Sequence, residues 1–217
     1  SIYVNLDDVN ILIDTPPEFR LAALASGISS VDAVLYTHAH ADHIAGFDDL
    51  RRFSEQNESP LELYVTPATV KIFKRSFLYA FGKPRQIGGG LPRVRLNAVK
   101  KSLVVKGKKI IPLPVFHGTI PVLGFRFGDF AYVTDVKTIP AQTMELMKGL
   151  ELLVLGVIRY KPHSTHINLE EALGIIEKLK PKKTLFTHMT HDFEHRTLAG
   201  QLPPGIEPAW DGMTVEV

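Results

Sequence analysis

The chain of 217 residues contains no cysteine. It therefore has no disulfide bond, no thiolate ligand and no thiol nucleophile. A chain without disulfides is typical of a reducing compartment, so we expect a cytoplasmic protein. Any catalytic chemistry must come from other side chains.

Long apolar segments and an excess of charge of one sign are also missing. The longest apolar run, 152–157, is far shorter than the roughly 20 residues of a membrane-spanning helix. Lys and Arg number 25 against 23 Asp and Glu, which leaves a net charge of +2. We therefore expect no membrane partner and regard nucleic acid, which favours a strongly basic surface, as the less favoured partner. A homodimer is compatible with this composition.

What is present is an ordinary globular composition. With 45% hydrophobic and 22% charged residues, a disordered or coiled-coil chain is excluded. No repeat or linker interrupts the chain, so we predict one domain over 1–217. The sequence begins with Ser1 and not with Met, so we expect an upstream piece to be missing. No basic and then apolar leader pattern is visible at its start.

Apolar runs with strand character alternate with helical patterns, which predicts an α/β (α+β) fold whose two β-rich parts form one sandwich covered by helices. We expect strands at 2–4, 9–13, 31–37, 61–65, 93–98, 103–105, 109–116, 122–127, 130–134, 151–157 and 183–187. We expect helices at 18–26, 44–55, 67–77, 140–149 and 168–180, the last capped by Asn168, and a mobile glycine-rich loop at 82–92.

The histidines are not scattered, because most of them directly follow a predicted strand. The nine are His38, His40, His43, His117, His163, His166, His188, His191 and His195. Loops at strand ends are where α/β folds build their sites, since a rigid sheet can aim several loops at one place. One isolated histidine of this kind is more often structural, but four such strand ends in one short chain predict a binding site.

The segment 37–43 offers four metal ligands within six positions. His38 and His40 lie two apart on extended backbone, so both rings can face one ion. Asp42 and His43 begin the next helix and can face a second ion. Imidazole together with carboxylate suits zinc, manganese or iron in a hydrolytic centre. A polar loop with capping residues is the less favoured alternative.

The motif Thr37-His38-Ala39-His40-Ala41-Asp42-His43 resembles the signature of the metallo-β-lactamase superfamily of binuclear hydrolases. The resemblance continues along the chain, in order, through His117, Asp135 and His188. It implies a four-layer αββα metallo-β-lactamase sandwich. It also implies that one metal is held by His38, His40 and His117, the other by Asp42, His43 and His188, with Asp135 as the bridge.

Finer features resemble one branch of this superfamily. Segments 14–20, 46–51, 161–172 and 187–192 look like the branch that contains the phosphoribosyl 1,2-cyclic phosphate phosphodiesterase of the carbon–phosphorus lyase pathway. The branch's glycine-rich first strand and the pathway enzyme's structural zinc ligands are not visible in this sequence. Either the sequence begins downstream of that strand or the chain is a shorter relative, so the natural substrate is not carried over.

Asp14 resembles the superfamily's early aspartate, which supports the metal loop. Capping of the helix that begins near Pro17 is the alternative role.

These features predict a phosphodiesterase that acts on small or cyclic phosphodiesters. Two divalent ions, about 3.5–4 Å apart, can hold a bridging hydroxide and neutralise charge on a phosphoryl group. Asp42 is a candidate to accept or orient the proton of the nucleophile.

His166 is our candidate proton donor to the leaving group, because the matching histidine of the branch lies on the substrate side of the metals. A structural position before the Asn168 cap is its alternative role. His191 is a candidate for the same proton transfer or for support of His188. Arg159 and Lys161 are candidates to bind phosphate, and a solvated surface pair is their alternative role.

Three alternatives stay open. A transfer-RNA processing endonuclease shares the ligand set, and so do lactam and thioester hydrolases. A silent metal-binding scaffold belongs to a different class and is less favoured, because a scaffold would tolerate the loss of Asp42 or Asp135.

Overall fold

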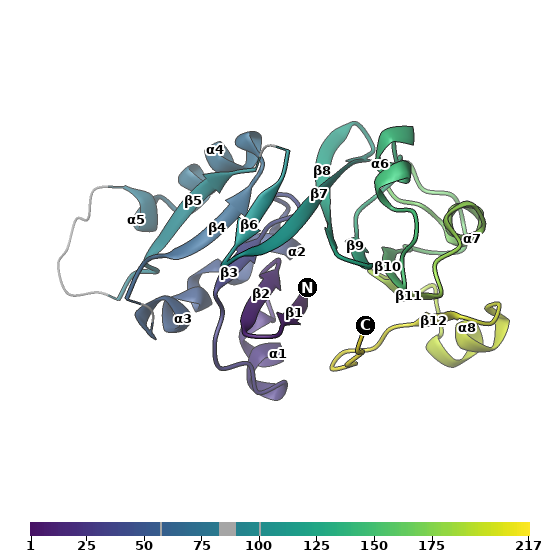
Figure 1. Cartoon of the computed structure of the whole chain (residues 1–217), viewed down its shortest axis with the longest axis horizontal. Helices are drawn as coiled ribbons and strands as arrows, with labels where there is room; N and C mark the ends of the chain where they lie inside the picture. Colours follow the sequence, from purple (N-terminus) through teal and green to yellow (C-terminus); the bar gives the residue numbers. More distant parts are fainter. Residues whose placement is uncertain (57, 83–89, 100) are drawn as a thin grey trace. The chain divides into compact units, whose positions relative to one another are not determined.

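The computed structural model describes residues 1–56, 58–82, 90–99 and 101–217. The predicted loop at 82–92 falls mostly on 83–89, outside the described residues. The chain divides into two compact units, Ser1–Lys108 (unit 1) and Lys109–Val217 (unit 2). Their elements are labelled in Figure 1. The single domain that we expect over the whole chain stays a prediction.

Unit 1 is built on a five-stranded sheet in the order β1-β2-β3-β4-β5. The strands are β1 (Ile2–Leu6), β2 (Val9–Ile13), β3 (Ala33–Leu35), β4 (Leu61–Val65) and β5 (Val94–Ala98). β1 and β2 form the expected antiparallel hairpin, whereas the pairs β2–β3, β3–β4 and β4–β5 are parallel. The carboxyl ends of β2 and β3 therefore share one edge, where Asp14 and His38 follow.

The helices of unit 1 surround a core rich in aromatic residues. They are α1 (Phe19–Ala25), α2 (Ala41–Ile44), the 3₁₀ helix η1 (Ala45–Leu50), α3 (Arg51–Gln56), α4 (Pro67–Ser76) and α5 (Leu78–Phe81). The prediction of a single helix over 44–55 is wrong, because this segment is divided among the three short helices α2, η1 and α3. Gly46 shows why: its N–H donates to Thr15 O (2.9 Å), and a Cβ would lie only 2.3 Å from the Pro16 carbonyl. This close backbone approach bends the chain.

Unit 2 contributes six strands to a seven-stranded sheet in the order β12-β11-β10-β9-β8-β7-β6. They are β7 (Lys108–His117), β8 (Ile120–Phe127), β9 (Phe130–Val133), β10 (Leu152–Gly156), β11 (Lys183–Thr187) and β12 (Ile206–Pro208), while β6 (Leu103–Val105) precedes the unit boundary. The pairs from β9 to β12 are parallel and those from β7 to β9 antiparallel. Every residue of β10 is buried, as its apolar sequence predicts.

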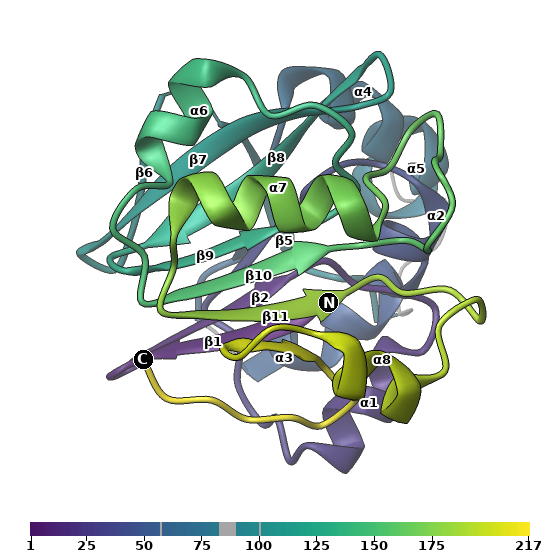
Figure 2. The ribbon, with the colours of Figure 1, turned by 90° about the vertical axis from the view of Figure 1, so that its right-hand side faces the viewer.

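Three helices accompany this sheet: α6 (Ala141–Leu146), α7 (Leu169–Leu179) and α8 (His195–Gln201). Figure 2 shows α7 lying across the face of β9, β10 and β11, where Leu169, Leu173 and Ile176 pack against the core of unit 2. We did not predict α8 or β12. α8 is capped by Glu194, which is not among the usual capping residues, and β12 is only three residues long.

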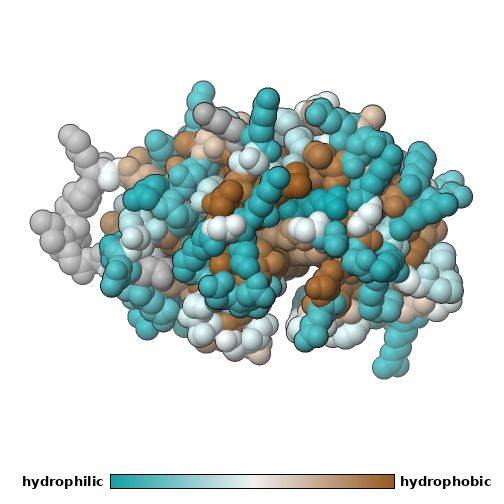
Figure 3. Space-filling model, viewed as in Figure 1, coloured by the Kyte–Doolittle hydropathy of each residue, from teal (hydrophilic) through white to brown (hydrophobic). Residues whose placement is uncertain are grey.

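None of the helices in the described part of the chain is long and apolar enough to cross a bilayer. The face visible in Figure 3 is mostly hydrophilic, with hydrophobic side chains in small groups.

The start of α7 provides a stability test, because Asn168 Oδ1 accepts from Glu171 N (3.0 Å) and Glu171 Oε2 accepts from Asn168 N (2.9 Å). Asn168→Ala should lower the free energy of unfolding by about 1 kcal/mol, since one helix N–H loses its partner. Urea denaturation measures this. The exposed Glu177→Ala on the same helix is the control and should change stability by less than about 0.5 kcal/mol. Equal effects of the two changes would contradict the capping role.

Candidate metal centre

Three candidate site residues adopt a backbone conformation that is rare for residues with a side chain. Asp14, Asp135 and His188 have φ angles of 61°, 51° and 57°, and each stands just after a parallel strand. Holding a non-glycine residue in this left-handed region costs on the order of 1–3 kcal/mol and recurs at functional sites. The contacts around these residues must therefore hold the backbone in this conformation.

In unit 1, the buried Asp14 carboxylate organises the loop after β3. Its Oδ1 accepts from Thr37 N (2.9 Å), and its Oδ2 accepts from the Thr37 hydroxyl (2.8 Å) and contacts His43 Nδ1 (2.7 Å). The first residue of α1 is preceded by Glu18, which makes no side-chain cap, so the capping role considered for Asp14 is wrong. Asp14 instead holds the histidine loop.

These contacts fix the proton positions on two histidines. The Thr37 hydroxyl gives its one proton to Asp14, so it must accept from His38 Nδ1 (3.0 Å). His43 Nδ1 donates to the Asp14 carboxylate in the same way. With the proton on Nδ1, the nitrogen that remains for a metal in both rings is Nε2. Metal-binding histidines in proteins are usually held by such a partner on the other nitrogen.

Asp42 and His40 lie at the solvent side of this loop. The Asp42 side chain is 61% exposed, and its Oδ2 lies 3.5 Å from His43 Nε2. Two ligands about 2.1 Å from one ion at a tetrahedral angle are roughly 3.4 Å apart, so this pair has the spacing of two ligands of one metal. The rings of His40 and His38 are in contact, with centroids 4.4 Å apart.

In unit 2, Asp135 is the centre of a second group. Its side chain is 3% exposed; Oδ1 accepts from the Thr134 hydroxyl (2.9 Å) and lies 2.9 Å from His188 Nε2, while Oδ2 lies 3.3 Å from His166 Nε2. A buried carboxylate needs positive charge or hydrogen bonds near it. A divalent cation or a protonated histidine supplies that charge.

His117, the last residue of β7, is oriented by a backbone group. Its Nδ1 lies 2.9 Å from Thr165 O, and because a carbonyl only accepts, Nδ1 carries the proton. Nε2 is therefore again the nitrogen left for a metal. The ring packs edge-on against His166, with centroids 4.4 Å apart.

One residue of this group was missed in the sequence. His163 Nδ1 lies 3.3 Å from His166 Nδ1, and burial, followed by the nearby His166, Arg159 and Lys137, lowers the pKa of His163. The spacing of three between the two histidines was the available signal, but a single loop of unknown conformation does not show whether such a pair meets.

Other candidates are not brought into these groups. The His191 side chain is 97% exposed and faces Asp192 at 3.8 Å. Arg159 donates to the carbonyls of Lys161 (3.3 Å) and Pro162 (2.9 Å) within its own loop, and Lys161 is exposed. His195 contacts Pro208 O at 3.2 Å, between α8 and β12.

The donors in each unit suit the metals expected from the sequence. In unit 1 the ligand atoms of His38 and His40, and those of Asp42 and His43, lie within 4.8 Å of each other. In unit 2 the same holds for Asp135 with His117 and with His188. Imidazole nitrogens and carboxylate oxygens are the ligands that zinc, manganese and iron accept. The role of each residue as a ligand stays a prediction.

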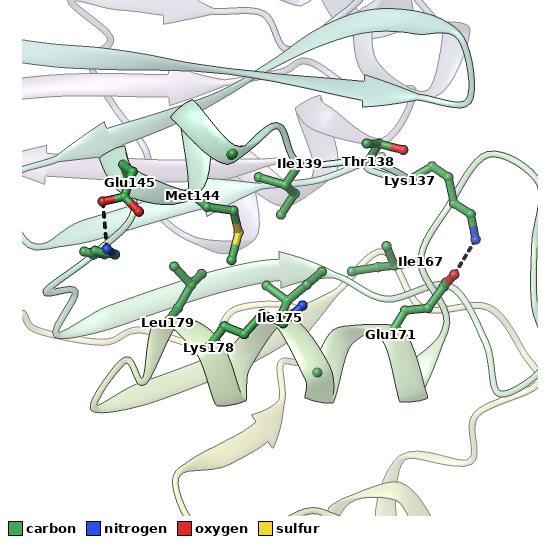
Figure 4. Close-up of a pocket in the computed structure, with 13 residues that line it drawn as sticks. Lys137, Thr138, Ile139, Met144, Glu145, Ile167, Glu171, Ile175, Lys178 and Leu179 are labelled. Atoms are coloured by element: carbon green, nitrogen blue, oxygen red, sulfur yellow. Dashed lines mark hydrogen bonds and ion pairs between the residues drawn. The ribbon is translucent and has the colours of Figure 1, made fainter.

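A separate groove of about 650 Å³ lies between α6 and α7 in unit 2 (Figure 4). Apolar side chains such as Ile139, Met144 and Ile175 line it. At its ends are the ion pairs Lys137–Glu171 (2.6 Å) and Lys148–Glu145 (2.7 Å). None of the candidate metal ligands is among its lining residues, so this groove is not the metal centre.

Comparison with known proteins gives one family across both units. A family model described as a beta-lactamase superfamily domain matches residues 9–189. A crystal structure of a new diphosphatase from the PhnP family is 41% identical, with a TM-score of 0.91, over 99% of this chain and 83% of that chain. The short form of human tRNase Z has a TM-score of 0.70 at 15% identity, over 99% of this chain and 90% of that chain, which shows similarity of fold alone.

Two curated relatives are longer than this chain. An octanoyltransferase of Porphyromonas gingivalis is 35% identical over 207 residues, which cover 94% of this chain and 41% of that protein. A ribonuclease Z of a Mycobacterium species is 29% identical over 163 residues, which cover 65% of this chain and 55% of that protein. The chain thus spans about half the length of the curated relatives it matches.

Asp14→Ala should weaken zinc binding by about 10- to 100-fold, because His43 and Thr37 lose the carboxylate that orients them. Competition with a chromophoric chelator measures the affinity without any substrate. Asp49→Ala, which removes a half-buried carboxylate of η1, is the matched control and should bind zinc as the parent protein does. If Asp14→Ala retained the parent affinity, Asp14 would have no part in orienting the ligands.

Proposed function

Because the chain belongs to the metallo-β-lactamase superfamily, we propose that it is a metal-dependent hydrolase of small phosphodiesters, including cyclic ones. The superfamily and its α/β fold class, expected from the sequence, are confirmed by the family match and by the PhnP-family relative. The observation that supports phosphoryl chemistry is the 41% identity, over nearly the whole chain, to a protein named as a diphosphatase of the PhnP family. The choice of diesters rests on the resemblance of segments 161–172 and 187–192 to the phosphodiesterase branch.

We further propose that the groups of the two units act as one binuclear centre. One metal position would be held by His38, His40, His117 and Asp135, the other by Asp42, His43, Asp135 and His188, with Asp135 common to both. Two findings support this proposal. Hydrogen bonds within each unit orient the ligand atoms of that unit, and the family match extends from unit 1 into unit 2. Zinc and manganese are the proposed ions, and iron also suits the donors.

Divalent ions in such a centre activate water at neutral pH and neutralise charge on a phosphoryl group. The chain itself supplies orientation and proton transfer. Asp14 and Thr37 hold the rings of His43 and His38 through Nδ1, so that Nε2 of each ring would be the nitrogen that binds a metal ion. Asp42, with its exposed carboxylate, would accept the proton of the attacking water. His166 would donate a proton from Nε2 to the oxygen of the leaving group.

A ribonuclease Z activity is the second candidate, because four curated relatives with that name match the chain at 29–31% identity. It would make a transfer-RNA precursor the substrate. The net charge of +2 favours a small substrate over a polyanion.

A substrate panel tests the proposed class. With zinc or manganese, the protein should hydrolyse a cyclic phosphodiester, a linear phosphodiester or a diphosphate diester faster than a phosphomonoester, a thioester, a β-lactam or a transfer-RNA precursor. Removal of the metal with a chelator should abolish turnover, and metal should restore it. Turnover of only the thioester, the lactam or the RNA would reject the proposal, and turnover of nothing at all would favour a scaffold.

His166→Ala tests the proton donor. Its kcat for a substrate with a poor alkoxide leaving group should fall by about 100-fold, the usual scale of general acid catalysis. A nitrophenolate barely needs that proton, so its kcat should fall much less, while metal content stays the same. His191→Ala is the control, because its exposed ring lies outside the group, and it should not change the ratio of the two rates. Equal losses for both leaving groups in His166→Ala would show a binding role instead.

A further inference from the structure

Thr165 is the residue through which two histidines of unit 2 are held. Its carbonyl accepts from His117 Nδ1 (2.9 Å). Its hydroxyl lies 3.0 Å from His166 Nδ1 and 3.2 Å from His163 Nδ1. Its methyl group packs on Gly118, where a Cβ would lie 2.9 Å away. Thr165 therefore contacts a candidate metal ligand with its backbone and the candidate acid with its side chain.

The backbone decides where the proton of His163 lies. Thr165 N donates to His163 Nδ1 (3.2 Å), so this nitrogen carries a lone pair and the proton of the neutral ring is on Nε2. Burial first, and then His166, Arg159 and Lys137, lower the pKa of His163, which favours the neutral ring. His163 Nδ1 is thus an acceptor.

His166 Nδ1 consequently faces two groups that can accept a hydrogen bond, the Thr165 hydroxyl and His163 Nδ1 at 3.3 Å. A proton on His166 Nδ1 satisfies this environment. Nε2 lies 3.3 Å from Asp135 Oδ2, and because a carboxylate only accepts, the acid form of the ring carries a second proton on Nε2. The backbone beside it is also fixed, since Ile167 N donates to Val136 O (2.7 Å) and Ile167 O accepts from Ile158 N (3.1 Å).

We propose that Thr165 and His163 are positioning residues for His166: together they hold the proton on its Nδ1 and direct its Nε2 toward the reacting group. As the acid, the doubly protonated ring gives its Nε2 proton to the leaving-group oxygen, keeps the proton on Nδ1, and takes a new Nε2 proton from water. The ring therefore does not have to turn between turnovers. This inference rests on the proposed hydrolase function for its kinetic consequence. The tautomer and the ring orientation are properties of unit 2 alone.

Thr165→Val and Thr165→Ser form a matched pair. Valine keeps the backbone carbonyl for His117 and the contact with Gly118 but has no hydroxyl, whereas serine keeps the hydroxyl and loses the methyl group. Thr165→Val should lower kcat for the alkoxide leaving group by about tenfold, the scale of one hydrogen bond, with little change in KM, metal content or nitrophenolate rate. Thr165→Ser should behave like the parent protein.

His163 offers a second pair. His163→Asn can place an amide oxygen near the position of Nδ1, so it should retain the parent ratio of alkoxide to nitrophenolate rates. His163→Leu has no acceptor at this position. Its rate with the alkoxide leaving group should therefore fall relative to its rate with nitrophenolate, as in Thr165→Val. If both leaving groups slowed equally in Thr165→Val and His163→Leu, or if neither did, the positioning role would be overturned.

A readout without substrate separates this inference from the proposed function. In ¹⁵N–¹H spectra of the histidine side chains, recorded at a pH at which the His166 ring is neutral, His166 of the parent protein should carry its proton on Nδ1. Thr165→Val and His163→Leu should give a mixture of the two tautomers, while Thr165→Ser and His163→Asn should not. A protein that hydrolysed no phosphodiester but showed this pattern would reject the function and support the positioning role. A tautomer unchanged in all four variants would overturn it.

Discussion

A carboxylate removed from water is unstable unless other groups replace its hydration, and this requirement shapes both units. Asp14 meets it with the Thr37 backbone, the Thr37 hydroxyl and His43. Asp135 meets it with Thr134, His188 and His166. His43 and His188 are candidate ligands, and Thr37 holds His38, so the contacts that satisfy the two carboxylates also orient these ring nitrogens. The geometry of the histidines follows from two buried negative charges.

The sequence was sufficient where one physical rule dominates. Strand β11 was located to the residue, and β10 was recognised because all of it is apolar and buried. The histidine loop after β3 was recognised from the spacing of its ligands after an apolar strand, whereas Asp135 and His188 were recognised through the resemblance to the superfamily. These rules depend on local patterns, which a single sequence displays.

Other features depend on contacts between distant segments, and the sequence could not supply them. The helix expected at 44–55 is broken because Gly46 meets Pro16, thirty residues earlier. His163 and Thr165 gain their roles from the fold of their loop around His166 and His117. His191 was a candidate for the same proton transfer as His166, yet its side chain is 97% exposed.

The left-handed backbone conformation at Asp14, Asp135 and His188 lowers the stability of the fold at positions whose side chains are candidates for activity. Glycine adopts such a conformation without strain, so a glycine at these positions would relax the backbone while removing the functional group. Selection for a more stable chain and selection for an active one therefore act in opposite directions at the same three positions. A search for thermostable variants scored only on folding would be drawn toward the changes that disable this protein.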